Sequence, residues 1–378
     1  MKIAIPKETR EHETRVAGVP ETVKKFVALG AEVVVQAGAG DGASLPDAAY
    51  EAAGATIAKT FAATVKGADA VLKIQRPTEA EAKSLAKGQM LFCTMSPYGD
   101  REMLGSLAEK GVDCFAMEFM PRITRAQSMD VLSSQANLAG YKAVLEAANA
   151  YGRAMPQMMT AAGTVAPAKV FIMGVGVAGL QAIATARRLG AIVTATDVRP
   201  ATEEQVASLG GKFIAVKNEE FAQAQTAGGY AKEMSDDYKK QQAELVAGHI
   251  AKQNIVITTA LIPGRKAPIL VTKEMVASMA PGSVIVDLAV EQGGNVEGAK
   301  LAENVVTDNG VTILGFANLP GRLTADASAL YSRNHLNFLT PFFKDKAFAL
   351  DDEDELVKGI RLTKGGEVVH PQLVAAKG

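Results

Sequence analysis

The sequence predicts an α/β protein made of two Rossmann-like domains with parallel sheets, separated by a cleft and joined by long helices. Short runs rich in Val and Ile alternate with segments of helical spacing, and this alternation occurs twice along the chain. Apolar strands that alternate with helices form parallel sheets covered on both faces. The length of 378 residues allows two domains, each with its own core.

The first series contains five predicted strands, at residues 2–6, 32–36, 70–74, 90–94 and 113–117. Helices are predicted between them, for example "ETVKKFVALG" (21–30) and "REMLGSLAEKG" (101–111). Each of these two segments ends on a glycine, which can cap the C-terminus of a helix.

The second series contains six predicted strands, at residues 169–173, 192–197, 212–216, 254–259, 283–288 and 311–315. Helical segments at 134–155 and 322–340 are expected to connect the domains. An acidic run follows, and then a hairpin that turns on Lys364-Gly365-Gly366. This tail is too short for a domain and is expected to fold onto the first one. The predicted domains are therefore 1–133 plus 325–378, and 134–324.

The composition argues against several classes of protein. Lys plus Arg number 40 and Asp plus Glu 41, and this balance disfavours general nucleic-acid binding. No run approaches the ~20 apolar residues that span a bilayer, and "MKIAIPKETR" lacks the features of a signal peptide. We therefore expect a cytoplasmic chain without direct membrane insertion. Cys93 and Cys114 lie in apolar runs and are predicted to be buried, reduced thiols, while the four scattered histidines predict no metal site.

A glycine pattern indicates a phosphate-binding loop. In "VFIMGVGVAGLQAIATARRLGAIVTATD", Gly174, Gly176 and Gly179 follow a strand and precede a helix. These glycines allow a tight turn, close approach of a pyrophosphate and close packing of helix on strand. Asp197 ends the next strand, where a carboxylate takes the adenosine ribose hydroxyls and repels a 2′-phosphate, which favours NAD(H). Arg199 weakens this preference because arginine can accept that phosphate. The alternative is a glycine-rich turn without a ligand.

A long polar segment separates two strands of the second series, from Val216 to Asn254. It is centred on Gly228-Gly229-Tyr230, and connections of this length are usually functional or disordered. A mobile loop over about residues 217–240 that closes on a ligand is predicted. The alternative is a surface insertion without a function.

A polar cluster, "PRITRAQSMDVLSSQANLAGY" (121–141), stands just before the first connecting helix. It is crowded with charged and hydrogen-bonding side chains that can bind a polar ligand, although its spacing alone matches no nucleotide or metal motif. Asp130 beside Arg122 could hold the arginine in place. The alternative is a capping network in which Asp130 or Ser133 caps the helix.

Several motifs together resemble one family over the whole chain. "PRITRAQSMDVLSSQANLAGY", "GVGVAGLQAIATARRLGA", "ATDVR", "TAGGYAKEM", "TTALIPG" and "PGSVIVDLAVEQGGN" are similar to the NAD(H)-binding component of proton-translocating nicotinamide nucleotide transhydrogenases. Alanine dehydrogenases are their close structural relatives. The resemblance implies that the second domain binds NAD(H), that the nicotinamide lies in the cleft, and that the protein is a homodimer.

The resemblance also assigns residues. It implies that Arg122, Gln127, Asp130 and Ser133 face the nicotinamide. Around the cofactor it places Val175, Gly176, Val177, Asp197, Val198, Arg199, Gly229, Tyr230, Gln242 and Leu261, with Tyr230 on the closing loop.

Alanine dehydrogenases need a general acid and base, because they move a proton as well as a hydride. Arg15 and Lys73 match their substrate residues. However, their histidine is absent from "LFCTMSPYGD" (91–100), and Glu291 stands where they have an aspartate. Transfer between two nicotinamides needs close, water-free rings rather than an acid or base. These departures favour a transhydrogenase, with Arg15 and Lys73 kept as structural ion pairs.

The leading hypothesis is direct, reversible hydride transfer between NAD(H) on this chain and NADP(H) on a partner domain. A membrane-spanning subunit would translocate the protons, and this chain would sit peripherally at the cytoplasmic side of the inner membrane. The alternatives are an alanine dehydrogenase or related amino-acid dehydrogenase, and a non-enzymatic NAD(H)-binding sensor.

Overall fold

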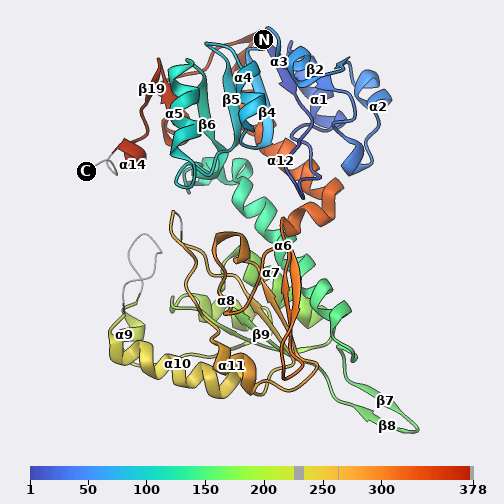
Figure 1. Cartoon of the computed structure of the whole chain (residues 1–378), viewed down its shortest axis with the longest axis vertical. Helices are drawn as coiled ribbons and strands as arrows, with labels where there is room; N and C mark the ends of the chain where they lie inside the picture. The colour runs from blue at the N-terminus through green and yellow to red at the C-terminus, as the bar shows by residue number, and fades with distance from the viewer. Residues whose placement is uncertain (225–233, 263, 375–378) are drawn as a thin grey trace. The chain divides into compact units, whose positions relative to one another are not determined.

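The computed structural model describes residues 1–224, 234–262 and 264–374. The chain divides into two compact units (Figure 1). Unit 1 is Met1–Gln135 with Pro320–Gly378, and unit 2 is Ala136–Leu319. Among the described residues, no helix is both long and apolar enough to cross a membrane.

Unit 1 contains a parallel sheet in the order β3-β2-β1-β4-β5-β6. Its strands are β1 (Lys2–Ile5), β2 (Glu32–Gln36), β3 (Thr56–Ala58), β4 (Ala70–Gln75), β5 (Met90–Thr94) and β6 (Asp113–Ala116). Successive residues of β4 enter different cores, since Leu72 and Ile74 pack in one cluster and Val71 in another. The sheet is therefore covered on both faces, as predicted. Strand β3 was not predicted, because it is a three-residue strand without a buried side chain.

Helices surround this sheet. They are α1 (Pro20–Ala28), α2 (Asp47–Ala52), α3 (Phe61–Val65), α4 (Glu79–Ser84), α5 (Arg101–Glu109), α12 (Thr324–Leu339), α13 (Glu355–Ile360) and α14 (Pro371–Val374). Asp100 caps α5 by accepting the Met103 N–H at 3.1 Å. The tail docks on β6, where Thr363 Oγ1 accepts the Cys114 N–H and donates to the Val112 carbonyl, both at 2.7 Å. The expected hairpin at Gly365-Gly366 joins β18 (Thr363–Lys364) to β19 (Glu367–Val368).

Unit 2 contains a sheet in the order β11-β10-β9-β12-β13-β15-β14. Its strands are β9 (Lys169–Met173), β10 (Ile192–Thr196), β11 (Lys212–Phe213), β12 (Ile255–Thr258), β13 (Val284–Asp287), β14 (Glu303–Val306) and β15 (Thr312–Gly315). All pairs are parallel except β14 with β15. The order reverses at β9, which has β10 on one side and β12 on the other. Ligands bind at such a switch point, outside the carboxyl ends of the strands.

The helices associated with unit 2 are α6 (Val131–Ala150), α7 (Val177–Arg188), α8 (Thr202–Ser208), α9 (Glu219–Ala222), α10 (Asp236–Ile250) and α11 (Lys273–Ser278). The division between the units falls within α6. A hairpin of β7 (Met158–Thr160) and β8 (Gly163–Val165) extends away from the body of unit 2 (Figure 1).

The segment predicted as a loop over about residues 217–240 contains more helix than expected. It includes α9 and the start of α10, which are capped by Asn218 and Ser235. Tyr238, Val246 and Ile250 are buried along α10 at helical spacing, a pattern that the many surrounding polar residues obscured.

Candidate functional site

The loop that follows β9 is shaped by three glycines with different surroundings. Gly174 has φ +102°, and a Cβ there would lie 2.5 Å from Thr259 Oγ1. A Cβ at Gly179 would lie 1.9 Å from the Gly174 carbonyl oxygen. A Cβ at Gly176 would meet no atom within 4 Å. The fold therefore requires glycine at two positions, while Gly176 leaves open space at the surface of the loop.

The N-terminus of α7 opens onto this space. Gly176 occupies the N-cap position, where it has no side chain to accept the N–H groups of the first turn. Ala182, Ile183 and Ala186 bury the opposite face of the helix against the sheet. These N–H groups and the positive end of the helix dipole form an anion-binding position.

Asp197 follows β10 beside the glycine loop, and its side chain is only 7% exposed. Its Oδ2 accepts the Val175 N–H at 2.7 Å, and its Oδ1 accepts the Arg199 N–H at 2.9 Å. The Arg199 guanidinium donates from Nε to Oδ1 and from Nη2 to Oδ2, both at 2.9 Å. These bonds to Asp197 raise the pKa of Arg199 above its usual value.

Three apolar side chains on the same segments are exposed. Val177, Val198 and Leu261 are 38%, 48% and 47% exposed. A flat aromatic base can cover side chains of this kind. Val175, in contrast, is buried in the core, so only its backbone is available to a ligand.

Gln242 of α10 is occupied by contacts within the protein. Its Oε1 accepts the Val216 N–H at 2.9 Å, and its Nε2 donates to Thr196 Oγ1 at 3.1 Å. It thus ties α10 to the end of β10, next to Asp197.

The structure adds a supporting network that was not predicted from the sequence. Thr259 Oγ1 donates to the Gly174 carbonyl at 3.0 Å. Asn295 is fully buried, accepts the Ala260 N–H at 3.0 Å and donates to the Ala260 carbonyl at 2.9 Å. Buried Asp287 accepts the Asn295 N–H at 2.8 Å. This network fixes the backbone that precedes Leu261. Asp287 and Asn295 lie within "DLAVEQGGN", but their burial could not be predicted from the motif.

Gly229 and Tyr230, predicted on the closing loop, lie outside the described residues. The flanks of that segment are held together by Glu220, which accepts the Ser235 N–H at 2.5 Å and the Ser235 Oγ–H at 2.7 Å. Phe221 and Tyr238 also stack, with ring centroids 6.3 Å apart.

The polar cluster of unit 1 lies on a 3₁₀ helix, Thr124–Met129, and on the first turn of α6. Arg122 and Gln127 are exposed, and Asp130 and Ser133 are half-buried. Asp130 accepts the Ser133 N–H at 3.0 Å and the Ser133 Oγ–H at 2.5 Å, so it caps α6. The capping alternative thus describes Asp130.

Other polar residues of the cluster hold unit 1 together. Arg125 forms a bidentate pair with Asp354, at 2.8 and 2.9 Å. The Ser128 carbonyl accepts from Asn334 Nδ2 at 2.9 Å and from Asn337 Nδ2 at 3.0 Å.

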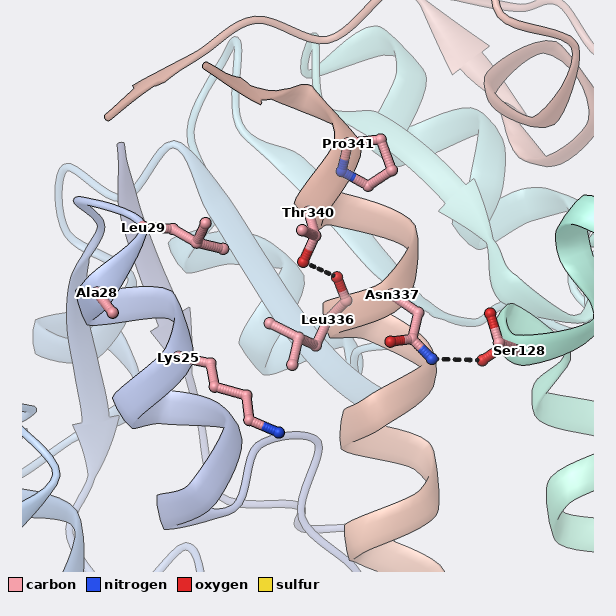
Figure 2. A pocket seen from close by; sticks show the side chains of 8 residues that line it. All are labelled: Lys25, Ala28, Leu29, Ser128, Leu336, Asn337, Thr340 and Pro341. Carbon is pink, nitrogen blue, oxygen red and sulfur yellow. Dashed lines mark hydrogen bonds between the residues drawn. The ribbon is translucent and has the colours of Figure 1, made fainter. Parts of the chain in front are cut away.

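Ser128 and Asn337 also border a groove of about 570 Å³ (Figure 2). The groove is lined by Lys25, Ala28, Leu29, Ser128, Leu336, Asn337, Thr340 and Pro341. Its one lysine pairs with Glu21 at 2.8 Å, and most of the remaining lining is aliphatic or neutral. This chemistry does not match a pyrophosphate, so the groove is not the candidate nucleotide site.

The residues that match a dehydrogenase substrate site are buried and paired. Arg15 is 7% exposed and forms a bidentate pair with Glu13, at 2.8 and 2.7 Å. Lys73 is 1% exposed and donates to Glu8 at 3.1 Å. Both cations therefore have internal carboxylate partners, as the prediction of structural ion pairs requires.

The fold and the glycine loop define an α/β protein with a unit of the type that binds dinucleotides. The family models for the N-terminal and C-terminal domains of alanine dehydrogenase/PNT match residues 4–139 and 143–371. The chain belongs to the alanine dehydrogenase/PNT family.

Its relatives span the full chain. It is 56% identical to an NAD(P) transhydrogenase alpha-subunit protein of Rhodospirillum rubrum, over 99% of both proteins. It is 31% identical to an alanine dehydrogenase of Halomonas elongata, over 97% of this chain and 94% of that one. The crystal structure of a transhydrogenase from Sinorhizobium meliloti superposes with a TM-score of 0.89 at 56% identity, covering 98% and 100% of the two chains. The family resemblance and the α/β fold class predicted from the sequence are confirmed.

Proposed function

We propose that this chain is the NAD(H)-binding component of a proton-translocating NAD(P) transhydrogenase. The observation that carries the proposal is its 56% identity, at full length, to a transhydrogenase alpha subunit. The loop of Gly174, Gly176 and Gly179 beside Asp197 supports it, since this combination suits a dinucleotide. In the reaction, a hydride passes directly and reversibly between NAD(H) on this chain and NADP(H) on a partner domain.

The residue roles follow the chemistry of each group. Gly174, Gly176 and Gly179 with the first turn of α7 bind the pyrophosphate, and Asp197 binds the adenosine ribose. Val177, Val198 and Leu261 contact the adenosine end, while Val175, Gly229 and Gln242 complete the cofactor site. Arg199 lies beside the ribose position, paired with Asp197. Arg122, Gln127, Asp130, Ser133 and Tyr230 serve the nicotinamide end. Asp130 does so as a positioning residue, because its carboxylate orients Ser133.

The environment of Arg15 and Lys73 favours this function over amino-acid oxidation. A substrate carboxylate would have to displace the buried Glu13 or Glu8, which already neutralise the two cations. The segment 91–100 also lacks the histidine that would move a proton. An alanine dehydrogenase and an NAD(H)-binding sensor remain the competing hypotheses.

The partners are proposed from the same relationship. A membrane-spanning subunit and an NADP(H)-binding domain would complete the enzyme at the cytoplasmic face of the inner membrane. We also propose a homodimer, supported by the β7–β8 hairpin. Met159 on this hairpin is 80% exposed and Met158 is 42% exposed, and isolated apolar arms of this kind commonly pack on a second subunit.

Reconstitution tests the function. Membranes stripped of this subunit would be assayed for hydride transfer from NADPH to an NAD analogue, with and without the purified chain. Restored transfer is expected. A chain that binds NADH but restores no transfer would contradict the proposal. NADH formation dependent on L-alanine would then identify an amino-acid dehydrogenase, and its absence would leave the sensor.

A further inference from the structure

We propose that the Arg199 side chain acts as a latch: it blocks the adenosine ribose site by pairing with Asp197, and the ribose of the dinucleotide must displace it. This inference rests on the proposed function, because it assumes that Asp197 binds that ribose. The side-chain guanidinium occupies the carboxylate in advance and competes with the ligand for it.

The acceptor positions of Asp197 carry the argument. A carboxylate has about four lone-pair positions for hydrogen bonds. Asp197 accepts four donors: the backbone N–H groups of Val175 and Arg199, and the Nε and Nη2 groups of Arg199. No position is left for a ribose hydroxyl while the Arg199 side chain stays in place.

The four donors fall into two classes. The Val175 and Arg199 N–H groups belong to the backbone of the loop and of the turn after β10, so they orient the carboxylate without competing with a ligand. The two guanidinium donors belong to a side chain that is 30% exposed and can leave by rotation. The 2′- and 3′-hydroxyls of a ribose also supply two donors. The two hydroxyls of one ribose can therefore replace the two hydrogen bonds that the guanidinium donates to Asp197.

A further contact holds the latch against the loop. Arg199 Nη2 also donates to the Val175 carbonyl at 3.1 Å. The closed guanidinium thus bridges the glycine loop and Asp197, and it lies next to the open space at Gly176. Removing it should favour every ligand that carries the ribose diol.

Calorimetric titration of the full chain tests the latch with Arg199→Met, which keeps an unbranched side chain but has no donor. NADH and ADP, which both carry the adenosine ribose diol, should bind on the order of fivefold more tightly, as loss of one partly exposed ion pair predicts. Reduced nicotinamide mononucleotide lacks that ribose and should bind as to the wild type. Arg199→Lys, which retains the charge but loses the bidentate geometry, should be intermediate.

Asp197→Asn separates the latch from the site itself. If this variant weakens NADH binding while Arg199→Met leaves it unchanged or weakens it, Asp197 binds the ribose but Arg199 is no latch. If Asp197→Asn leaves NADH binding unchanged, both the latch and the ribose role of Asp197 are wrong. The reconstitution of hydride transfer still decides the overall function in that case, because it does not depend on which residue holds the ribose.

Discussion

The three glycines of the phosphate loop have one sequence pattern but two physical roles. Gly174 and Gly179 are required because protein atoms lie where a side chain would be, at 2.5 and 1.9 Å from the added Cβ. Gly176 has no such neighbour. The role proposed for it is to leave space for the pyrophosphate, and measurement can separate this role from a packing role.

Gly179→Ala should destabilise the protein more than Gly176→Ala does. The first methyl group overlaps the Gly174 carbonyl oxygen, and overpacking of this kind costs about 1–3 kcal/mol. Urea unfolding followed by circular dichroism measures this loss. Gly176→Ala should lower the free energy of unfolding by less, since the added methyl group meets no atom and only the preference for glycine over alanine at an N-cap is lost. It should bind NADH more weakly, because the methyl group takes the space proposed for the pyrophosphate. Equal stability of the two variants would contradict the packing argument.

The carboxyl group of Glu118 should make the free energy of unfolding depend on pH. Glu118 is half-buried, accepts the Met95 N–H at 2.9 Å and the Ser96 N–H at 2.6 Å, and loss of solvent around its carboxyl group raises its pKa from 4.5 to about 7. Arg76 is a charged group that acts on it in the opposite direction. Since the folded carboxyl holds its proton more tightly, its stabilising contribution is fully present below pH 4.5 and is lost as the pH rises through about 7.

Glu118→Gln removes this titration. Between about pH 5 and pH 8, the wild type should lose on the order of 2–3 kcal/mol of unfolding free energy relative to the variant. Urea unfolding of both proteins at the two pH values measures the difference. Parallel pH dependences would show that Glu118 keeps an ordinary pKa.

At the scale of elements, the position of α7 depends on a close contact with α6. A Cβ at Gly140 of α6 would lie 2.0 Å from the carbonyl oxygen of Ala178, in the first turn of α7. This turn carries the N–H groups proposed to bind the pyrophosphate. The packing of two helices thus sets the position of an anion-binding site.

Gly140→Ala should therefore weaken NADH binding as well as lower stability, by about 1–3 kcal/mol for the overpacked contact. Gly248→Ala is the matched control, because Gly248 lies in α10 and an added Cβ there meets nothing within 4 Å. That variant should be more stable by about 0.5–1 kcal/mol, since alanine favours a helix. Loss of NADH affinity in both variants would mean that the α6–α7 contact has no special role.

At the scale of the whole molecule, the two large sheets share a common strand order. The order β3-β2-β1-β4 in unit 1 corresponds to β11-β10-β9-β12 in unit 2. In each sheet the strand order therefore reverses at the strand that comes first in sequence, while its two neighbours stay parallel to it. Only unit 2 has the glycine loop after that strand. In unit 1 the equivalent region follows β1 and contains Glu8, Glu13 and Arg15, which pair within the protein.

The β7–β8 hairpin should affect assembly rather than folding. Met158→Ser with Met159→Ser removes exposed apolar surface, so the stability of each chain should stay within about 0.5 kcal/mol of the wild type. We expect the proposed dimer to dissociate at a higher protein concentration than the wild type does, which sedimentation velocity over a concentration series measures. An unchanged dimer would exclude this hairpin from the interface, and a monomeric wild type would overturn the dimer itself.

The sequence by itself determined the fold class and predicted the outline of the proposed nucleotide site. Strands of the β9 and β12 type are continuous apolar runs, and the spacing of Gly174, Gly176, Gly179 and Asp197 is a local property of the chain. Local patterns of this kind survive folding because the strand, the turn and the helix that form the loop are adjacent in sequence. Short or half-exposed elements such as β3 and β14 lack such a pattern and were missed.

Only the tertiary structure decided which polar groups are already occupied. The sequence predicted that Asp197 binds the ribose, and it left Asp130 with either a nicotinamide or a capping role. It could not show that Arg199 fills the first carboxylate, nor decide that the second caps α6. It also could not show Asn295 holding the backbone at Ala260. The bonds of Asp197 and Asp130 depend on the backbone conformation and side-chain rotamers of the folded chain, and those of Asn295 depend on the packing of separate segments, whereas a motif records only residue types and their spacing.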